Sequence, residues 1–259
     1  MGHSGAMISD AVHSASDVFS TMIVMLGITI ASRQSDDDHQ YGHDRLECVA
    51  AILLAVVLFA TGIGIGVGGI NKIIDGTAGK AGIPGMIALI AAIGSIVVKE
   101  AMFWYTRNAA KKINSGALMA DAWHHRSDAL SSVGALIGIG GARLGFPILD
   151  PIASVIICIF IVKAAYDIFK DAVDKMVDKS CDEETEEKMR QLIKAQPGVL
   201  KVDVLRTRLF GAKMYVDIEI LADGDISLRE GHEIAQVVHD KVEETFPLVK
   251  HCMVHVNPL

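Results

Sequence analysis

The chain lacks the features that indicate a nucleic-acid partner, an oxidising compartment or a thiolate zinc site. It has no basic block, and its net charge is −7, with 31 acidic against 24 basic side chains, so nothing in it predicts nucleic-acid binding. Its four cysteines are scattered without a CxxC pair, which favours a reducing cytosolic face over a disulfide framework. The N-terminal stretch lacks a basic segment followed by an apolar one, so we predict no cleavable signal peptide.

Charged side chains are also absent from three long stretches, residues 48–71, 81–98 and 151–162. An apolar run of about 18 or more residues is long enough to cross a bilayer as a helix. The third stretch reaches that length only if Lys163 lies near an interface, where its long side chain can extend to water. We predict five membrane-spanning helices in the first part of the chain, at residues 5–32, 46–72, 82–106, 113–143 and 148–175.

A polar motif occurs twice within this apolar region. SDAVHSASDVFS near the start and ADAWHHRSDALS about a hundred residues later share the pattern Asp-Ala-x-His-x-x-Ser-Asp-x-x-Ser. Residues four apart on a helix lie on one face, so His13 shares a face with Asp17, and His124 with Asp128. Three crossings separate the two predicted helices, which therefore run antiparallel and can place both pairs at one depth.

These four groups predict a metal site inside the membrane. Ionisable side chains at that depth cost about 2.5–3.5 kcal/mol each to insert, so they are rare without a function. Two imidazoles and two carboxylates complete a tetrahedral shell for Zn²⁺ and neutralise its charge. The alternative is that the groups hydrogen-bond helix to helix, with Ser16 and Ser127 as small packing residues. Asp10 and Asp121 match as well but lie almost two turns away, so we expect them to line the path of the ion.

A second polar cluster lies in the loop SDDDHQYGHDRLE, just outside the membrane. Asp36, His39 and His43 are close in sequence, and the two histidines have i, i+4 spacing. This spacing fits a second metal site and fits equally a solvated acidic turn that attracts cations.

The stretch GIGVGG at residues 64–69 matches the GxGxxG pattern of dinucleotide sites. No strand precedes it and no ribose-binding acid follows it in register, as such a site requires. We therefore predict that its small residues serve close helix packing.

After residue 177 the composition changes to that of a soluble domain. We predict a helix over 183–196, two strands around a Gly211-Ala212 turn, a helix begun by a Ser227–Glu230 capping box, and a last strand in HCMVHVNP. The order α-β-β-α-β packs as a small two-layer α+β domain. Its histidines and carboxylates are either ordinary exposed residues or metal ligands, and composition alone favours the first.

The stretches HSASD, DDDHQYGHDRLE, HHRSD and LDPIASVIICIFIV, in this order, resemble the cation diffusion facilitator family of divalent-metal transporters. The resemblance runs from about Ser4 to the C-terminus. It implies a six-helix α-helical membrane domain followed by a small α+β cytoplasmic domain, ferredoxin- or metallochaperone-like, in a homodimer. Members of the family have one more membrane helix before the HSASD helix, so we expect this chain to lack the first helix of the family fold.

The resemblance also implies metal ligands by position. The transport site of the family falls on His13, Asp17, His124 and Asp128. Its loop site falls on Asp36, His39 and His43. In the C-terminal domain the nearest matches to the family's ligands are Asp203, Glu219, His232 and His255. Asn257 stands where some members carry a carboxylate, and the His/Asp pairing on both helices resembles the zinc-selective branch rather than the manganese-type branch.

We therefore predict a cation-efflux domain in the membrane at residues 1–177 and a cytoplasmic domain for metal sensing and dimerisation at residues 178–259. The predicted function is proton-coupled export of Zn²⁺ by alternating access, with Cd²⁺, Co²⁺, Fe²⁺ or Mn²⁺ as alternative cargo. The expected partners are divalent metal ions, protons, the lipid bilayer, which we take to be a bacterial cytoplasmic membrane, and a second copy of the chain.

Two alternatives remain open at this point. The first is a metal sensor or partner subunit that does not transport, which the expected loss of one helix favours. The second is an intramembrane zinc metalloenzyme. A catalytic zinc keeps an open coordination position, whereas four ligands fill a tetrahedral shell and the chain has no HExxH motif, so the enzyme is the weaker alternative.

Overall fold

The computed structural model describes the chain except for residues 1–21, 77–85, 144–145 and 147. The chain divides into two compact units, one up to Ala172 and one from Val173 on. This division falls near the change of composition after residue 177. Each unit has its own hydrophobic core.

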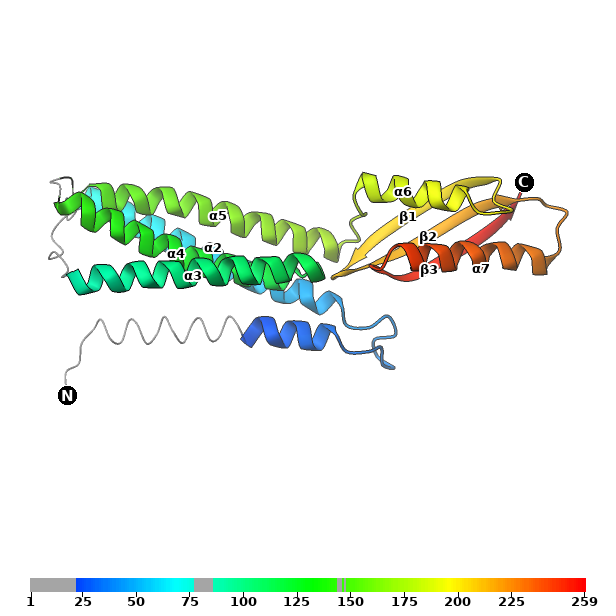
Figure 1. The fold of residues 1–259 in the computed structure, drawn as a ribbon, viewed down its shortest axis with the longest axis horizontal. Coiled ribbons are helices and arrows are strands. Elements are labelled where there is room, and N and C mark those ends of the chain that lie inside the picture. The colour runs from blue at the N-terminus through cyan, green and yellow to red at the C-terminus, as the bar shows by residue number, and fades with distance from the viewer. Residues whose placement is uncertain (1–21, 77–85, 144–145, 147) are drawn as a thin grey trace. The chain divides into compact units, whose positions relative to one another are not determined.

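The N-terminal unit is built from long helices (Figure 1). A helix at Met22–Ala31 is followed by the labelled elements α2 (Arg45–Ile74), α3 (Met86–Ile113), α4 (Gly116–Arg143) and α5 (Leu149–Met176). Four of them match predicted spans. The first predicted span, residues 5–32, is described only from Met22 on, so its earlier part lies outside the described residues.

Two helices among the described residues are long and apolar enough to cross a membrane, α2 and the Pro151–Met176 part of α5. Helix α3 continues past its predicted end at residue 106 to Ile113. The added segment RNAAKKI is rich in alanine and lysine, which favour the helix. The helix ends directly before Asn114, whose φ of 54° is left-handed and typical of the residue that follows a helix.

Glycines on α2 allow α5 to approach closely. A Cβ atom added to Gly66 would lie 2.5 Å from Cys158 Sγ, and one added to Gly69 would lie 3.0 Å from the carbonyl oxygen of Pro151. A Cβ on Gly64 or Gly68 would meet nothing within 4 Å. The prediction that this glycine-rich stretch serves helix packing is confirmed.

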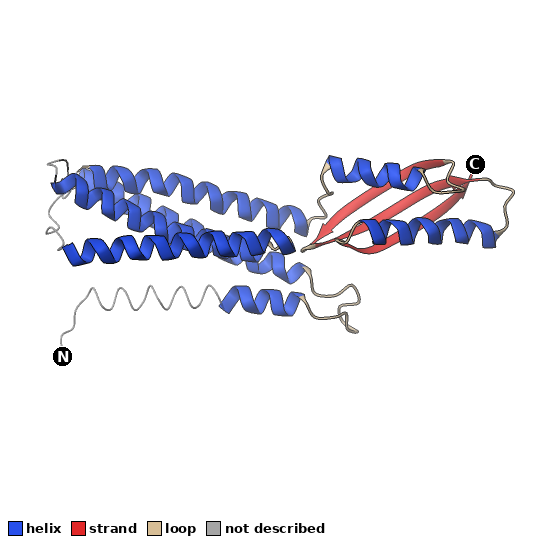
Figure 2. Ribbon diagram, viewed as in Figure 1, coloured by secondary structure: helices blue, strands red, loops and turns tan. Residues whose placement is uncertain are grey.

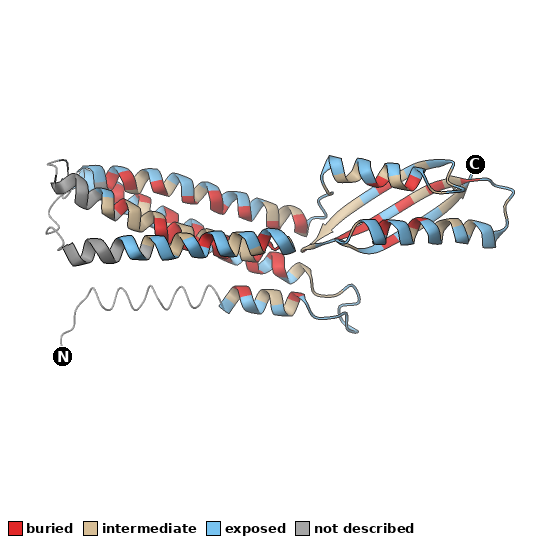
Figure 3. Ribbon diagram, in the orientation of Figure 1, coloured by how far each residue is buried: buried red, intermediate tan, exposed pale blue. Residues whose placement is uncertain are grey.

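The core of the helical unit is formed by aliphatic side chains of four helices. Its buried members are Val24, Leu54, Ala55, Leu58, Ala120, Ile157, Ile161, Ala165 and Ile168. Helix α4 also packs against α3 and α2. Other apolar side chains of α2 point outward, among them Leu53, Val56 and Phe59, which are 52%, 54% and 46% exposed. Figure 3 shows this separation of buried and exposed residues along the helices, and an exposed apolar face of this length suits contact with lipid.

The C-terminal unit has the predicted order α-β-β-α-β (Figure 2). Its elements are α6 (Glu183–Lys194), β1 (Lys201–Phe210), β2 (Lys213–Ala222), α7 (Leu228–Thr245) and β3 (Val249–Pro258). The sheet order is β1-β2-β3, with β1 antiparallel and β3 parallel to β2. The Gly211 turn, where φ is 63°, and the Ser227–Glu230 capping box of α7 are both present as predicted.

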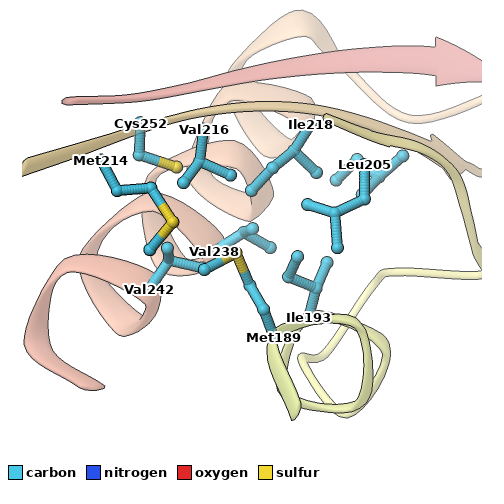
Figure 4. Close-up of a cluster of buried hydrophobic side chains, with 10 residues drawn as sticks. Met189, Ile193, Leu205, Met214, Val216, Ile218, Val238, Val242 and Cys252 are labelled. Carbon is cyan, nitrogen blue, oxygen red and sulfur yellow. The ribbon is translucent and has the colours of Figure 1, made fainter. Parts of the chain in front are cut away.

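Both helices of this unit cover one face of the sheet. Met189 and Ile193 of α6 and Val238 and Val242 of α7 join one core with alternate residues of the strands (Figure 4). In β2, Val216, Ile218 and Ile220 are buried. Because side chains alternate along a strand, the residues between them lie on the face that no helix of this unit covers.

Candidate metal sites

The described half of the predicted transport site lies on α4. His124 and Asp128 are 6% and 5% exposed and stand one turn apart on the helix. Asp121 and His125 are buried as well. The four residues follow i, i+3, i+4 and i+7 spacing and form one polar stripe along α4. His13 and Asp17, the other half of the predicted site, lie outside the described residues.

Asp128 is paired with a lysine of the neighbouring helix. Lys99 Nζ of α3 donates a hydrogen bond to Asp128 Oδ2 at 3.1 Å. Sequence reasoning missed this contact, although Lys99 is the first charged residue after the uncharged stretch 81–98. A lysine directly after an apolar stretch is the available signal, but the sequence does not show which residue of α4 it meets.

A second pair lies further toward the N-terminus of α4. His125 Nε2 and Asp121 Oδ2 are 3.6 Å apart, and Asp121 Oδ1 is buried without a hydrogen-bond partner among the described residues. His125 was not a predicted site residue, because the first copy of the motif has Ser14 in its place. The expectation that Asp121 lines the path of the ion stays a prediction.

Helices α3 and α4 make further polar and aromatic contacts beside Lys99. Arg126 lies 3.4 Å from Glu100 Oε1, and its guanidinium lies 4.3 Å from the centre of the Phe103 ring. The rings of Phe103 and Trp123 meet edge to face at 5.7 Å. These contacts fix α3 against α4 independently of the Lys99–Asp128 pair.

The loop before α2 brings its three predicted ligands together. One potential ligand atom each of Asp36, His39 and His43 lies within 4.8 Å of the other two. Asp36 Oδ1 accepts a hydrogen bond from the backbone N–H of His39 at 2.7 Å, and Asp36 Oδ2 lies 3.4 Å from His43 Nε2. The turn closes at Gly42, where φ is 88° and the backbone N–H donates to the His39 carbonyl.

The electrostatics of this loop favour a charged carboxylate. The backbone N–H of His39 is the largest cause that lowers the pKa of Asp36, and both histidines add to it. The His43 side chain is 9% exposed, and its Nδ1 has no hydrogen-bond partner among the described atoms. An anionic oxygen and two imidazole nitrogens at this spacing are a donor set suited to a borderline divalent cation.

The four predicted ligands of the C-terminal unit are only partly brought together. Glu219 of β2 is the register partner of His255 of β3, on the uncovered face of the sheet. Asn257 Nδ2 donates to Glu219 Oε2 at 3.4 Å. Asp203 lies at an irregularity of β1 and pairs with Lys201 at 2.7 Å. His232 lies on α7, one of the helices on the covered face, so the sheet separates it from the Glu219–His255 pair.

Family models match both units of the chain. The model of the cation efflux transmembrane domain matches residues 1–177, and that of the cation efflux protein cytoplasmic domain matches residues 181–259. The chain belongs to the cation diffusion facilitator family. It is therefore a membrane protein with a cytoplasmic C-terminal domain, in a family of divalent-cation efflux transporters that are not enzymes. The intramembrane enzyme is set aside.

Several relatives match this family member along nearly its whole length. The uncharacterized transporter YdbO of Bacillus subtilis (strain 168) is 34% identical over 99% of this chain and 87% of its own. The manganese efflux system protein MneP of the same organism is 31% identical over 100% of this chain and 88% of its own. Metal tolerance protein C1 of Arabidopsis thaliana is 33% identical over 98% of this chain. The chain spans 57% of the length of that plant protein.

Several solved structures of the MamM C-terminal domain resemble part of this chain. A nickel form of the MamM C-terminal domain is 22% identical, covers 30% of this chain and 99% of its own, and superposes with a TM-score of 0.30.

Proposed function

We propose that this protein exports Zn²⁺ from the cytoplasm in exchange for protons, with His13, Asp17, His124 and Asp128 as the transport site. The observation that carries the proposal is the burial of His124 and Asp128 on one face of α4. Burying ionisable groups among apolar helices costs free energy, so such groups are rare unless they have a function. Binding a cation is such a function.

The ligand types favour Zn²⁺ among the divalent cations. Imidazole nitrogen suits zinc, whereas Mn²⁺ is held mainly by carboxylates and water. The relative MneP is a manganese efflux system protein by name, so Mn²⁺ is the second candidate cargo, ahead of Cd²⁺, Co²⁺ and Fe²⁺. Metal competition during transport distinguishes the two candidates.

Proton coupling follows from the same four groups. A proton and a divalent cation compete for imidazole nitrogens and carboxylate oxygens. A site that opens outward and takes up protons there loses its metal. When the site opens toward the cytoplasm again, it releases the protons there. This cycle is alternating access around a fixed site.

The remaining predicted groups have accessory roles in this proposal. Asp36, His39 and His43 capture a second cation in the loop before α2, where the ligand atoms are already gathered. Residues 178–259 sense cytoplasmic metal and join two copies of the chain, with Asp203, Glu219, His232 and His255 as the candidate ligands. The name of the matched cytoplasmic family model, ZT_dimer, supports the dimer. We place the protein in the cytoplasmic membrane of a bacterium.

The test is zinc flux into liposomes that contain the purified protein and a zinc-sensitive dye. A pH gradient drives uptake, and Asp128→Asn is compared with Asp167→Asn, which removes the same charge from an exposed position of α5. We expect Asp128→Asn to abolish pH-driven Zn²⁺ flux and Asp167→Asn to leave it at the wild-type level. Undiminished flux in Asp128→Asn would overturn the site, and zinc binding without flux in the wild type would favour a sensor. Preferential inhibition by Mn²⁺ would reassign the cargo.

A further inference from the structure

We propose that Lys99 is a tethered cation of the transport site, which pairs with Asp128 in the absence of metal and which the incoming ion must displace. This inference rests on the proposed function, since it assigns a role to Lys99 only if Asp128 binds the cargo. It makes Lys99 a positioning residue that sets how tightly the metal is held.

The first support is the geometry of the pair. Lys99 Nζ lies 3.1 Å from Asp128 Oδ2, and the side chains are 20% and 5% exposed. A charged hydrogen bond of this length is among the stronger side-chain contacts. The carboxylate that the sequence predicts to be a metal ligand therefore pairs with a cationic side chain of the protein.

The second support is the free-energy cost of leaving the buried Asp128 carboxylate without a cationic partner. A carboxylate that is almost fully buried is strongly destabilised when it has no cationic partner. A carrier must pass through a state in which its site holds no metal, and in that state Asp128 still needs compensation. The ammonium group of Lys99 supplies a positive charge at the oxygen atom where a metal would bind.

The third support is that the pair is one of several contacts between α3 and α4. The Glu100–Arg126 pair at 3.4 Å and the Phe103–Trp123 ring contact at 5.7 Å already join α3 to α4. Lysine is also suited to repeated displacement, because its compact charge sits on a flexible four-carbon stem. An ion pair with a purely structural role would not need to include a proposed metal ligand.

The consequence for transport is a weaker but more readily released metal. A divalent cation that binds Asp128 is repelled by the ammonium group and must move it from the carboxylate, so part of the binding free energy is spent on that displacement. When the metal leaves, Lys99 returns to Asp128 and stabilises the empty site. Removing the lysine charge should therefore tighten metal binding and slow metal release.

The experiment measures Zn²⁺ transport and Zn²⁺ affinity for three single variants of the full chain. Lys99→Gln removes the charge, Lys99→Arg keeps it, and Glu100→Gln breaks the neighbouring ion pair without touching a ligand. We expect Lys99→Gln to lower KM and the equilibrium Kd for Zn²⁺ by at least about tenfold while kcat falls. Lys99→Arg and Glu100→Gln should keep KM within about twofold of the wild type.

An unchanged or raised Kd in Lys99→Gln would overturn the proposal, because removing a purely structural ion pair would give that result. Equal effects of Lys99→Gln and Lys99→Arg on Kd would also overturn it, since the charge would then be irrelevant. If Lys99→Gln is not recovered as folded protein, Lys99→Met replaces it with a stem of similar length and no charge, and the same outcomes apply. Absence of flux in the wild type would refute the proposed export, whereas the Kd comparison separately tests whether Lys99 competes with the metal for Asp128.

Discussion

The contact of Gly66 with α5 gives a sharp prediction about how the helices are held together. A Cβ atom at Gly66 would lie 2.5 Å from Cys158 Sγ and 2.9 Å from Cys158 Cβ, whereas non-bonded carbon atoms are most stable about 3.5–4.0 Å apart. The thiol can rotate away, but Cys158 Cβ is fixed to the backbone, so Gly66→Ala must push α2 and α5 apart by at least about 0.6 Å. Overpacking of this kind costs about 1–3 kcal/mol, so we expect Gly66→Ala to lower the stability of the helical unit.

Gly64→Ala is the matched control, because it adds the same methyl group to the same helix where nothing lies within 4 Å. The gain in helix propensity from glycine to alanine is about 1 kcal/mol, so this variant should be as stable as the wild type or more stable. The assay is thermal unfolding of the purified chain in detergent, followed by tryptophan fluorescence. Equal unfolding temperatures for the two variants would refute the close approach of α2 and α5, and relief of the Gly66→Ala defect by Cys158→Ala would support it.

Two further predictions concern the C-terminal unit. Burial raises the pKa of the Cys252 thiol to about 12, and nearby acidic groups add to the effect. We therefore expect Cys252 to resist iodoacetamide at pH 8 in the folded chain and to react after denaturation. Labelling is measured by mass spectrometry of the peptide, and rapid labelling without denaturant would contradict the burial. Hydrogen bonds from Ser227 lower the pKa of Glu230 below its ordinary value of 4.5. The capping box of α7 therefore contributes stability above pH 4.5 that is lost as the pH falls through the lower folded pKa. Amide exchange in the first turn of α7 should consequently be faster in Glu230→Gln than in the wild type at pH 6, and this difference should shrink near pH 3; a difference independent of pH would disprove the contribution of the charge.

Much of the fold could be predicted because its signals are local. An uncharged stretch such as residues 48–71 indicates a membrane helix by length alone, and the Ser227–Glu230 box marks the start of α7. The end of α3 was predicted too early, at residue 106, because the aromatic and basic residues there resemble a membrane boundary. A change of residue type does not by itself end a helix, and α3 continues to Ile113, directly before the left-handed Asn114.

In the candidate sites, too, contacts within one element could be predicted from the sequence, whereas contacts between elements could not. Residues on one helix or in one short loop have their spacing fixed by the local backbone, so the nearness of His124 to Asp128 and of Asp36 to His39 followed from the sequence. Contacts between elements depend on how helices cross and how strands pair. The meeting of Lys99 with Asp128, and the separation of His232 from Glu219 by the sheet, could not be found from spacing.

Because contacts between helices cannot be read from sequence spacing, a ligand motif describes only part of a proposed transport site. A motif identifies groups that suit a cation, but the groups that compensate their charge without the cation are not part of it. In this chain Asp128 is paired with Lys99 of another helix, and Asp36 is paired with the two histidines of its own loop. In the loop, the groups that contact Asp36 are also the other candidate ligands, so a metal would bind the same residues. At Asp128 the compensating group is an ammonium that cannot bind a metal, so metal binding must break the pair. The candidate loop site and the proposed transport site are therefore expected to bind the same ion with different affinity, although both combine imidazole and carboxylate groups.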